Sequence, residues 1–140
     1  MDNSSDLERG ADRQTLLVVD DDAEWTDLLK FYFVEKYQVQ VVNVAGDAIE
    51  KINQVQPDLI IVDLVMPSMD GFGIIHRIKH SSDGKIPIIL VTGWNTQEVE
   101  ECAASVGCAA VVGKPVSLPH LEEVVSSLVG LPAQASVASL

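Results

Sequence analysis

The chain has 140 residues, of which 47% are hydrophobic and 21% are charged, which favours one globular domain and excludes a chain that is disordered throughout. Nine Lys and Arg residues against 21 Asp and Glu residues give a formal net charge of -12, so the chain repels nucleic acids and no direct DNA or RNA binding is expected. No apolar run approaches the roughly 18 residues that span a bilayer, and the N-terminus lacks the pattern of a signal peptide. A cytoplasmic location without membrane contact is therefore expected.

The two ends of the chain differ in composition from its middle. Residues 1–14 are polar and charged, so we expect a disordered leader there. Residues 131–140 are rich in small side chains and follow Gly130, which is typical of a flexible tail or linker. The folded domain is expected to cover residues 15–130.

Five short apolar runs predict the strands, in chain order. Four of them are continuous, as is typical of strands buried on both faces of a parallel sheet. These four runs cover residues 16–19, 59–62, 88–91 and 109–112. The remaining run, at residues 39–44, mixes polar residues among valines and indicates an edge strand.

The segments between the runs carry apolar side chains at helical spacing. The stripes are Trp25, Leu28, Leu29, Tyr32 and Phe33; Ala48, Ile49, Ile52 and Val55; Ile74, Ile75 and Ile78; Val99, Cys102, Ala103 and Val106; and Leu118, Leu121, Val124, Val125 and Leu128. Helix starts are predicted where Asn95 precedes Glu98 by three residues, as in a capping box, and where Ser117 precedes Pro119. Five strands thus alternate with five helices, which predicts an open, doubly wound α/β sheet with right-handed crossovers.

The cysteines and histidines do not form a metal or redox motif. Cys102 and Cys108 have neither CxxC spacing nor a histidine pair nearby, so core packing is the simplest interpretation of both. His76, His80 and His120 lie in helical segments and are expected on the surface or at helix ends.

Polar side chains follow four of the predicted strands. They are Asp20 and Asp21 after the first run, Asp63 after the second continuous run, Thr92 after the next, and Lys114 after the last. The carboxyl ends of parallel strands form one edge where ligands bind, and carboxylates gathered there favour a compensating cation. Because the ligands are all oxygen, Mg²⁺ is favoured over zinc. Taken singly, these acids could simply cap a helix or a loop, as Asp22 is expected to do.

Other phosphate-binding motifs are absent from the sequence. The chain has no GxxxxGK[ST] loop, and the glycines at positions 71 and 73 lack the third glycine of a dinucleotide fingerprint. A phosphatase of the haloacid dehalogenase type requires a second Asp two residues after its nucleophile, where this chain has Val65. Nucleophile arrangements built on Ser, Cys or His are missing as well.

Four motifs in order carry a family resemblance: Val18-Val19-Asp20-Asp21-Asp22, Asp63-Leu64-Val65-Met66-Pro67-Ser68-Met69-Asp70-Gly71, Val91-Thr92-Gly93, and Gly107 with Gly113-Lys114-Pro115. Over residues 16–129 the chain resembles a response-regulator receiver domain of two-component signalling, similar to chemotaxis regulators. The resemblance implies a flavodoxin-like fold, with a doubly wound five-stranded parallel sheet in the order 2-1-3-4-5 and five helices.

The resemblance also implies the chemistry. Asp63 would accept a phosphoryl group from a phosphohistidine on a histidine kinase or a histidine phosphotransfer protein. Asp21 and Asp63 would bind Mg²⁺ through their carboxylates, Val65 through its backbone carbonyl, and Asp20 through a metal-bound water. The domain would catalyse only its own phosphorylation and dephosphorylation, and so would not be an enzyme in the usual sense.

Lys114 and Thr92 would contact the phosphoryl oxygens, and the Lys114–Pro115 peptide would be cis. The output would be a population shift of the face formed by the fourth helix, fifth strand and fifth helix, at residues 95–106, 109–112 and 117–129. A downstream protein target would dock on this face, which would also allow a homodimer.

Two departures from the family pattern affect these expectations. Val111 occupies the place of the usual aromatic switch residue, so coupling from Thr92 would run through loop and helix shifts or be weak. Val65 and Trp94 are hypothesised to shield the phosphoryl group from water, although Trp94 could instead be an exposed aromatic in a partner-binding loop. A docking module that is not phosphorylated and a small Mg²⁺-dependent phosphatase remain as alternatives, and the sequence does not distinguish a stand-alone regulator from one domain of a longer protein.

Overall fold

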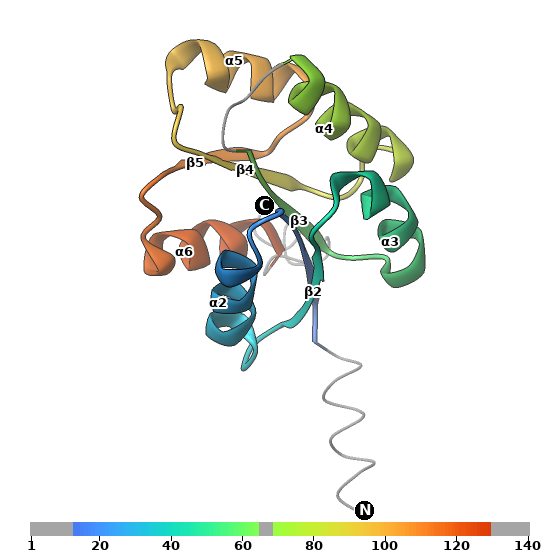
Figure 1. The fold of residues 1–140 in the computed structure, drawn as a ribbon, viewed down its shortest axis with the longest axis vertical. Helices are drawn as coiled ribbons and strands as arrows, with labels where there is room; N and C mark the ends of the chain where they lie inside the picture. The colour runs from blue at the N-terminus through green and yellow to red at the C-terminus, as the bar shows by residue number, and fades with distance from the viewer. Residues whose placement is uncertain (1–12, 65–68, 130–140) are drawn as a thin grey trace, which may run out of the picture.

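The computed structural model describes residues 13–64 and 69–129, and in these ranges strands alternate with helices (Figure 1). The strands are β1 (Thr15–Val19), β2 (Gln38–Val42), β3 (Leu59–Asp63), β4 (Ile88–Thr92) and β5 (Ala110–Gly113). The helices are α2 (Ala23–Phe33), α3 (Ala48–Val55), α4 (Met69–Ser81), α5 (Gln97–Ser105) and α6 (Leu118–Val129), and a 3-10 turn, η1 (Ala45–Asp47), precedes α3. Most of the predicted leader and all of the predicted tail lie outside the described residues.

The five strands form one parallel sheet in the order β2-β1-β3-β4-β5, as predicted. The central strand pairs are in register so that Val19 lies opposite both Val42 and Val62. β2 is an edge strand, which confirms the interpretation of its mixed composition. β5 is the other edge, and only Val112 in it is buried. Ala110 packs partly against one core cluster and Val111 partly against the other, so the two faces of this run are only partly buried and the prediction of full burial is wrong.

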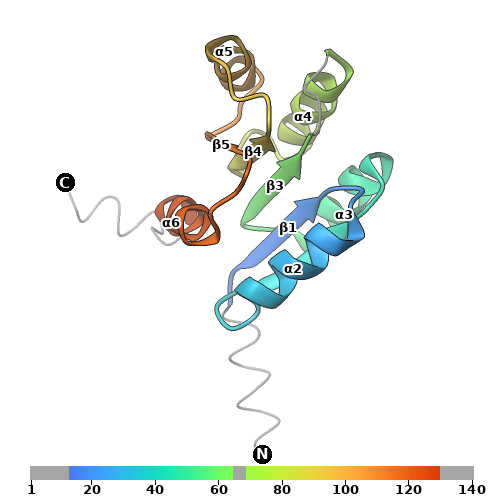
Figure 2. The same cartoon turned by 60° about the vertical axis from the view of Figure 1, so that its left-hand side comes forward.

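Two layers of helices cover the sheet (Figures 1 and 2). Successive strand residues point to opposite faces, so Leu16 and Val18 join one hydrophobic cluster while Leu17 and Val19 join the other. α2 and α6 pack over the first face, and α3, α4 and α5 pack over the second. The core is thus divided by the sheet into two compartments.

Helices α2 and α5 each begin after a side-chain cap, with one shift from the prediction. The Asp22 carboxylate accepts hydrogen bonds from the backbone N–H groups of Glu24 and Trp25, so it caps α2 as expected. The N-cap of α5 is Thr96, whose hydroxyl accepts from Val99 N, and not Asn95. The capping box predicted at Asn95 is therefore wrong by one residue.

The buried stripe of α2 is narrower than its apolar pattern predicts. Thr26, Leu29 and Phe33 are buried, whereas the Leu28 side chain is 46% exposed. The prediction that Leu28 belongs to the buried stripe is therefore wrong. A helix that lies on a sheet buries the side chains pointing straight at the strands, so apolar residues at the side of the stripe remain in solvent.

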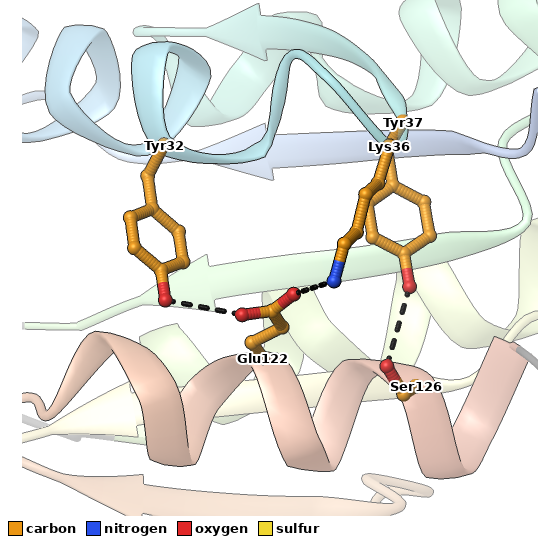
Figure 3. Close-up of polar contacts among 5 residues, drawn as sticks. All are labelled: Tyr32, Lys36, Tyr37, Glu122 and Ser126. Carbon is orange, nitrogen blue, oxygen red and sulfur yellow. Dashed lines mark hydrogen bonds and ion pairs between the residues drawn. The ribbon is translucent and has the colours of Figure 1, made fainter.

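A polar seam joins the end of α2 to α6 (Figure 3). The Tyr32 hydroxyl donates a hydrogen bond of 3.1 Å to Glu122 Oε1, and the Lys36 ammonium pairs with Glu122 Oε2. One turn further along α6, the hydroxyls of Tyr37 and Ser126 lie 3.5 Å apart. The seam fixes the position of α6 against α2 at the end of the molecule remote from the strand-end acids.

The cysteines differ from each other. Cys102 is exposed, so its predicted core packing is wrong, because it lies on the solvent side of α5. Cys108 packs partly against the second cluster, and burial raises the pKa of its thiol to about 11. His76, His80 and His120 are exposed, as predicted. None of the helices in the described part of the chain combines the length and apolarity needed to cross a membrane.

Candidate functional site

The carboxyl ends of the strands bring the predicted site residues that the structure describes to one edge of the sheet. Asp63 ends β3 and Thr92 ends β4, while Asp20 follows β1 and Lys114 follows β5. Asp20 and Asp63 are each 6% exposed, and Thr92 is completely buried. Acidic side chains that are this deeply buried require either a partner or a cation.

Three carboxylates line one cleft at this edge. Asp20, Asp21 and Asp63 share a hollow of about 500 Å³ with residues from the end of β2 and from α4. Burial raises the pKa of Asp20 from its ordinary 3.8 to about 7; a hydrogen bond from the backbone N–H of Asp22 opposes the rise, and the nearby charge of Asp63 adds to it. Asp20 therefore binds a proton much more readily than an ordinary carboxyl group does.

Lys114 contacts Asp63 from a neighbouring part of the edge. Its ammonium reaches across the end of β4 and lies 2.7 Å from Asp63 Oδ1. The Asp63 side chain is fully buried, and neither of its oxygens has an aligned hydrogen-bond donor within the described ranges. Lys114 thus offsets the charge of Asp63 by proximity, while the carboxylate oxygens still lack a directed hydrogen bond.

Thr92 lies beside this pair, and among the described residues its hydroxyl makes no hydrogen bond to the side chain of Asp63 or Lys114. The Thr92 Oγ1 accepts a hydrogen bond of 3.1 Å from Trp94 N, which leaves the hydroxyl proton to be donated elsewhere. The Trp94 side chain is 54% exposed. The backbone N–H of Lys114 donates to the Thr92 carbonyl, so the loops after β4 and β5 are tied together.

Two further expectations concern the backbone and the fifth strand. The Lys114–Pro115 peptide is cis, as the family resemblance implied. Val111 packs partly against the second cluster, in the place expected for an aromatic switch. Val65, predicted to offer a backbone carbonyl to the metal, lies outside the described residues.

The donor set fits a hard divalent cation. Within residues 13–64 and 69–129, no three His, Cys, Asp or Glu side chains converge into a ready metal cage. Mg²⁺ does not need one, because it usually keeps several waters and takes one or two carboxylates from the protein. The buried Asp63 oxygens without directed donors and the elevated pKa of Asp20 are both expected of a carboxylate site that a cation completes.

Asn43 is a site residue that the sequence patterns did not reveal. It follows β2, lines the same cleft as Asp20, and donates a hydrogen bond of 2.8 Å to the Asp20 carbonyl. The predicted run at residues 39–44 placed Asn43 inside the edge strand, whereas β2 ends at Val42 and Asn43 follows it. The mixed composition of that run instead indicated only its place at the edge.

Comparisons with known proteins bear on the family and the fold of the chain. The sequence model of the response regulator receiver domain matches residues 16–126. A probable cyclic di-GMP phosphodiesterase of Vibrio cholerae is 33% identical over 109 residues, which are 77% of this chain. The chain spans only 25% of the length of that relative.

Two solved structures are similar over nearly their whole length. The signal receiver domain of a DNA-binding response regulator from Colwellia psychrerythraea is 30% identical, with a TM-score of 0.74 over 84% of this chain and 98% of that one. The chemotaxis protein CheY4 of Vibrio cholerae is 24% identical and shares the fold, with a TM-score of 0.75 over 83% of this chain and 98% of that one. The chain therefore belongs to the family of response regulator receiver domains of two-component signalling.

Proposed function

We propose that Asp63 accepts a phosphoryl group from a phosphohistidine and that this modification is the signal the domain transmits. The observation that carries the proposal is the buried Asp63 carboxylate, which has the Lys114 ammonium at 2.7 Å, no directed hydrogen-bond donor among the described residues, and two further acids in the same cleft. A carboxylate with these surroundings is oriented and only partly compensated, as a nucleophile must be.

We further propose that Mg²⁺ is the cation of this site. Asp21 and Asp63 would hold it through their carboxylates, and Asp20 through a bound water, with the Val65 carbonyl as the remaining protein ligand that the resemblance implies. The cation supplies positive charge that lets an anionic carboxylate approach an anionic phosphoryl group.

The chain's own residues would divide the remaining work. In the transfer, a P–O bond forms to an Asp63 oxygen as the P–N bond to the partner's imidazole breaks, and the imidazole takes up a proton on leaving. Lys114 would pair with a phosphoryl oxygen in place of its present contact with the carboxylate. Thr92 would donate its hydroxyl proton to another phosphoryl oxygen, since its oxygen already accepts from Trp94 N.

Signalling would then proceed by protein contact. The phosphoryl contacts of Thr92 and Lys114 would favour one arrangement of α5, β5 and α6, and a difference of a few kcal/mol is enough to invert a minority state. The partners would be a histidine kinase or a phosphotransfer protein upstream and a protein target downstream, in the cytoplasm. The domain would catalyse only its own phosphorylation and dephosphorylation.

Intact mass measurement tests this proposal. The protein is incubated with Mg²⁺ and acetyl phosphate beside Asp63→Asn, an EDTA control, and Asp27→Asn as a matched removal of an exposed carboxylate on α2. We expect one phosphoryl adduct in the wild type and in Asp27→Asn, and none with Asp63→Asn or EDTA.

A second candidate function, docking without phosphorylation, is favoured by one observation. Val111 occupies the place of the aromatic switch residue, and its side chain has no polar group that could form a new hydrogen bond when Thr92 moves. The same measurement separates the two functions. If the wild type forms no adduct and binds no Mg²⁺, the phosphoacceptor proposal is wrong, and the domain is to be studied as a docking module.

A further inference from the structure

Asn43 occupies an unusual position at the end of the edge strand β2. Its Nδ2 donates a hydrogen bond of 2.8 Å to the Asp20 carbonyl and lies 3.4 Å from Thr26 Oγ1. A single side chain thus touches the loop that carries the site acids and the helix that follows this loop.

The Asp20 backbone is fixed on both sides of the residue. Its N–H donates to the Val42 carbonyl at 3.0 Å, one residue beyond the last strand pair of β1 and β2. Its carbonyl accepts from Asn43, and its Oδ1 accepts from Asp22 N at 3.2 Å. Of these three bonds, the one from Asn43 is the only one whose donor is a side chain, so a substitution at position 43 removes it, together with the contact to Thr26, and leaves the other two bonds in place.

Thr26 closes the network on the helix side. It is 1% exposed, although its place in α2 faces an apolar core, and its hydroxyl donates to the Ala23 carbonyl at 3.0 Å. A buried hydroxyl is retained where it has partners, and here these are Ala23 and Asn43. Asn43, Asp20 and Thr26 therefore link the end of β2, the acidic loop and the first turn of α2.

We infer that Asn43 is a positioning residue for the metal-binding carboxylates: it holds the loop of residues 20–22 so that Asp20 and Asp21 face Asp63. This inference rests on the proposed function, because it assigns Asn43 to the proposed cation site. Asn43 itself contacts neither the cation nor the phosphoryl group in this scheme. Without its hydrogen bond the loop would have more conformations, and the cation would have to order the loop as it binds.

Hydrogen exchange tests the holding role without any metal. Asn43→Leu removes the donor at similar size, and Asn53→Leu makes the same change at an exposed position of α3. In EDTA we expect the amides of Asp20 and Asp22 to exchange several-fold faster in Asn43→Leu than in the wild type or Asn53→Leu, with both variants fully folded. Unchanged exchange at these amides would overturn the inference.

Magnesium affinity tests the consequence for the site. By NMR titration, we expect Asn43→Leu to weaken Mg²⁺ binding by about three- to tenfold, the equivalent of one hydrogen bond, and Asn53→Leu to leave it unchanged. At saturating Mg²⁺, the phosphorylation rate of Asn43→Leu should return to within about twofold of the wild type, because the bound cation then orders the loop. General damage to the fold would lower the rate at every Mg²⁺ concentration, and that result would contradict a positioning role.

The two proposals fail in different ways. If the wild type binds no Mg²⁺, the proposed function is wrong, and the exchange measurement alone decides whether Asn43 holds the loop. If the wild type binds Mg²⁺ and Asn43→Leu binds it equally well, the proposed function stands and the role of Asn43 is wrong.

Discussion

Asp20 and Asp63 place two carboxyl groups in a buried cleft, and Lys114 is the cation that pairs with Asp63 within the described ranges. The usual way to keep such an arrangement folded is to hold a proton or to bind a cation. Proton binding at Asp20 and cation binding at the same edge are therefore alternatives, and both respond to pH.

The raised pKa of Asp20 makes folding stability depend on pH in a definite direction. Because the folded pKa of about 7 lies above the ordinary 3.8, the folded state binds the extra proton, and this stabilisation is lost as pH rises through 7. In EDTA at pH 8, we expect Asp20→Asn to raise the free energy of unfolding by about 1–2 kcal/mol, allowing for partial solvation of the site. Thermal unfolding followed by circular dichroism measures this difference.

Asp20→Asn should lose its advantage in stability over the wild type when Mg²⁺ is present. Wild-type stability should rise on adding Mg²⁺ at pH 8, and this gain should shrink toward pH 6, where the cation must displace the Asp20 proton. Asp20→Asn should gain less from Mg²⁺ at any pH. A variant that is less stable than the wild type in EDTA at pH 8 would contradict the assignment of a costly buried charge to Asp20.

Trp94 allows a prediction about the lifetime of the proposed phosphoryl group. If its half-exposed indole shields the group from water, Trp94→Glu should shorten the lifetime several-fold, as measured by loss of the adduct mass over time. If Trp94 instead belongs to a partner-binding loop, the lifetime will stay unchanged while binding to a partner weakens. Trp25→Phe, a change in the half-buried tryptophan of α2, provides the matched control.

For single residues, the sequence predicts the site residues that directly follow an apolar run. It misses residues whose role depends on a contact with a distant part of the chain. Asp63, Thr92 and Lys114 could be placed at one edge because each follows an apolar run. The hydrogen bond from Asn43 to the Asp20 carbonyl joins residues 23 positions apart, and no local pattern encodes it. The exposure of Cys102 is likewise set by which side of α5 faces the core, where Ala103 is the buried residue.

Helices α2 and α6 meet through a seam in which one carboxylate has two partners. Lys36 lowers the pKa of Glu122, and the Tyr32 hydroxyl lowers it further. The stabilisation from this pairing is therefore present above the ordinary value of 4.5 and is lost as pH falls through the lower folded value. The relative position of the two helices should depend on this charge.

Glu122→Gln tests the seam by removing the charge at constant size. We expect a melting temperature a few degrees below the wild type at pH 7, with the difference shrinking below pH 4.5 and at high salt. Glu123→Gln, at the neighbouring position with an 83% exposed side chain, should melt like the wild type. Equal effects of the two substitutions would mean that the seam does not stabilise the domain.

The apolar patterns predicted where the strands and helices lie more accurately than they predicted which side chains are buried. Four continuous runs and one mixed run identified the five strands, since few other structures bury four successive apolar residues. Periodicity also identified α2, but it assigned Leu28 to the buried face and did not distinguish an interior strand from β5 at the edge. Burial depends on which element lies opposite, and strand order came from the family resemblance rather than from the patterns.

The whole molecule carries a formal charge of -12, which favours solubility and opposes compactness through self-repulsion. Added salt screens this repulsion, and it also weakens favourable surface pairs such as Lys36 with Glu122. Because acids outnumber bases by more than two to one, we expect repulsion to dominate.

The melting temperature in EDTA should therefore rise by several degrees between low and physiological ionic strength. Sodium chloride and potassium chloride should act alike, since the effect depends on screening and not on a bound ion. A melting temperature that falls with salt would indicate that the ion pairs stabilise the fold more than the net charge destabilises it.

The division of the core by the sheet gives the proposed output face a particular property. α5 belongs to one helix layer and α6 to the other, and the edge strand β5 lies between them (Figure 2). A target that binds to both helices spans the full thickness of the molecule at this edge. The affinity of such a target therefore depends on the spacing of the two helix layers. A change in side-chain volume at a buried position such as Val112 or Ala103 would alter this spacing. Target affinity would then change although every residue that the target contacts stays the same.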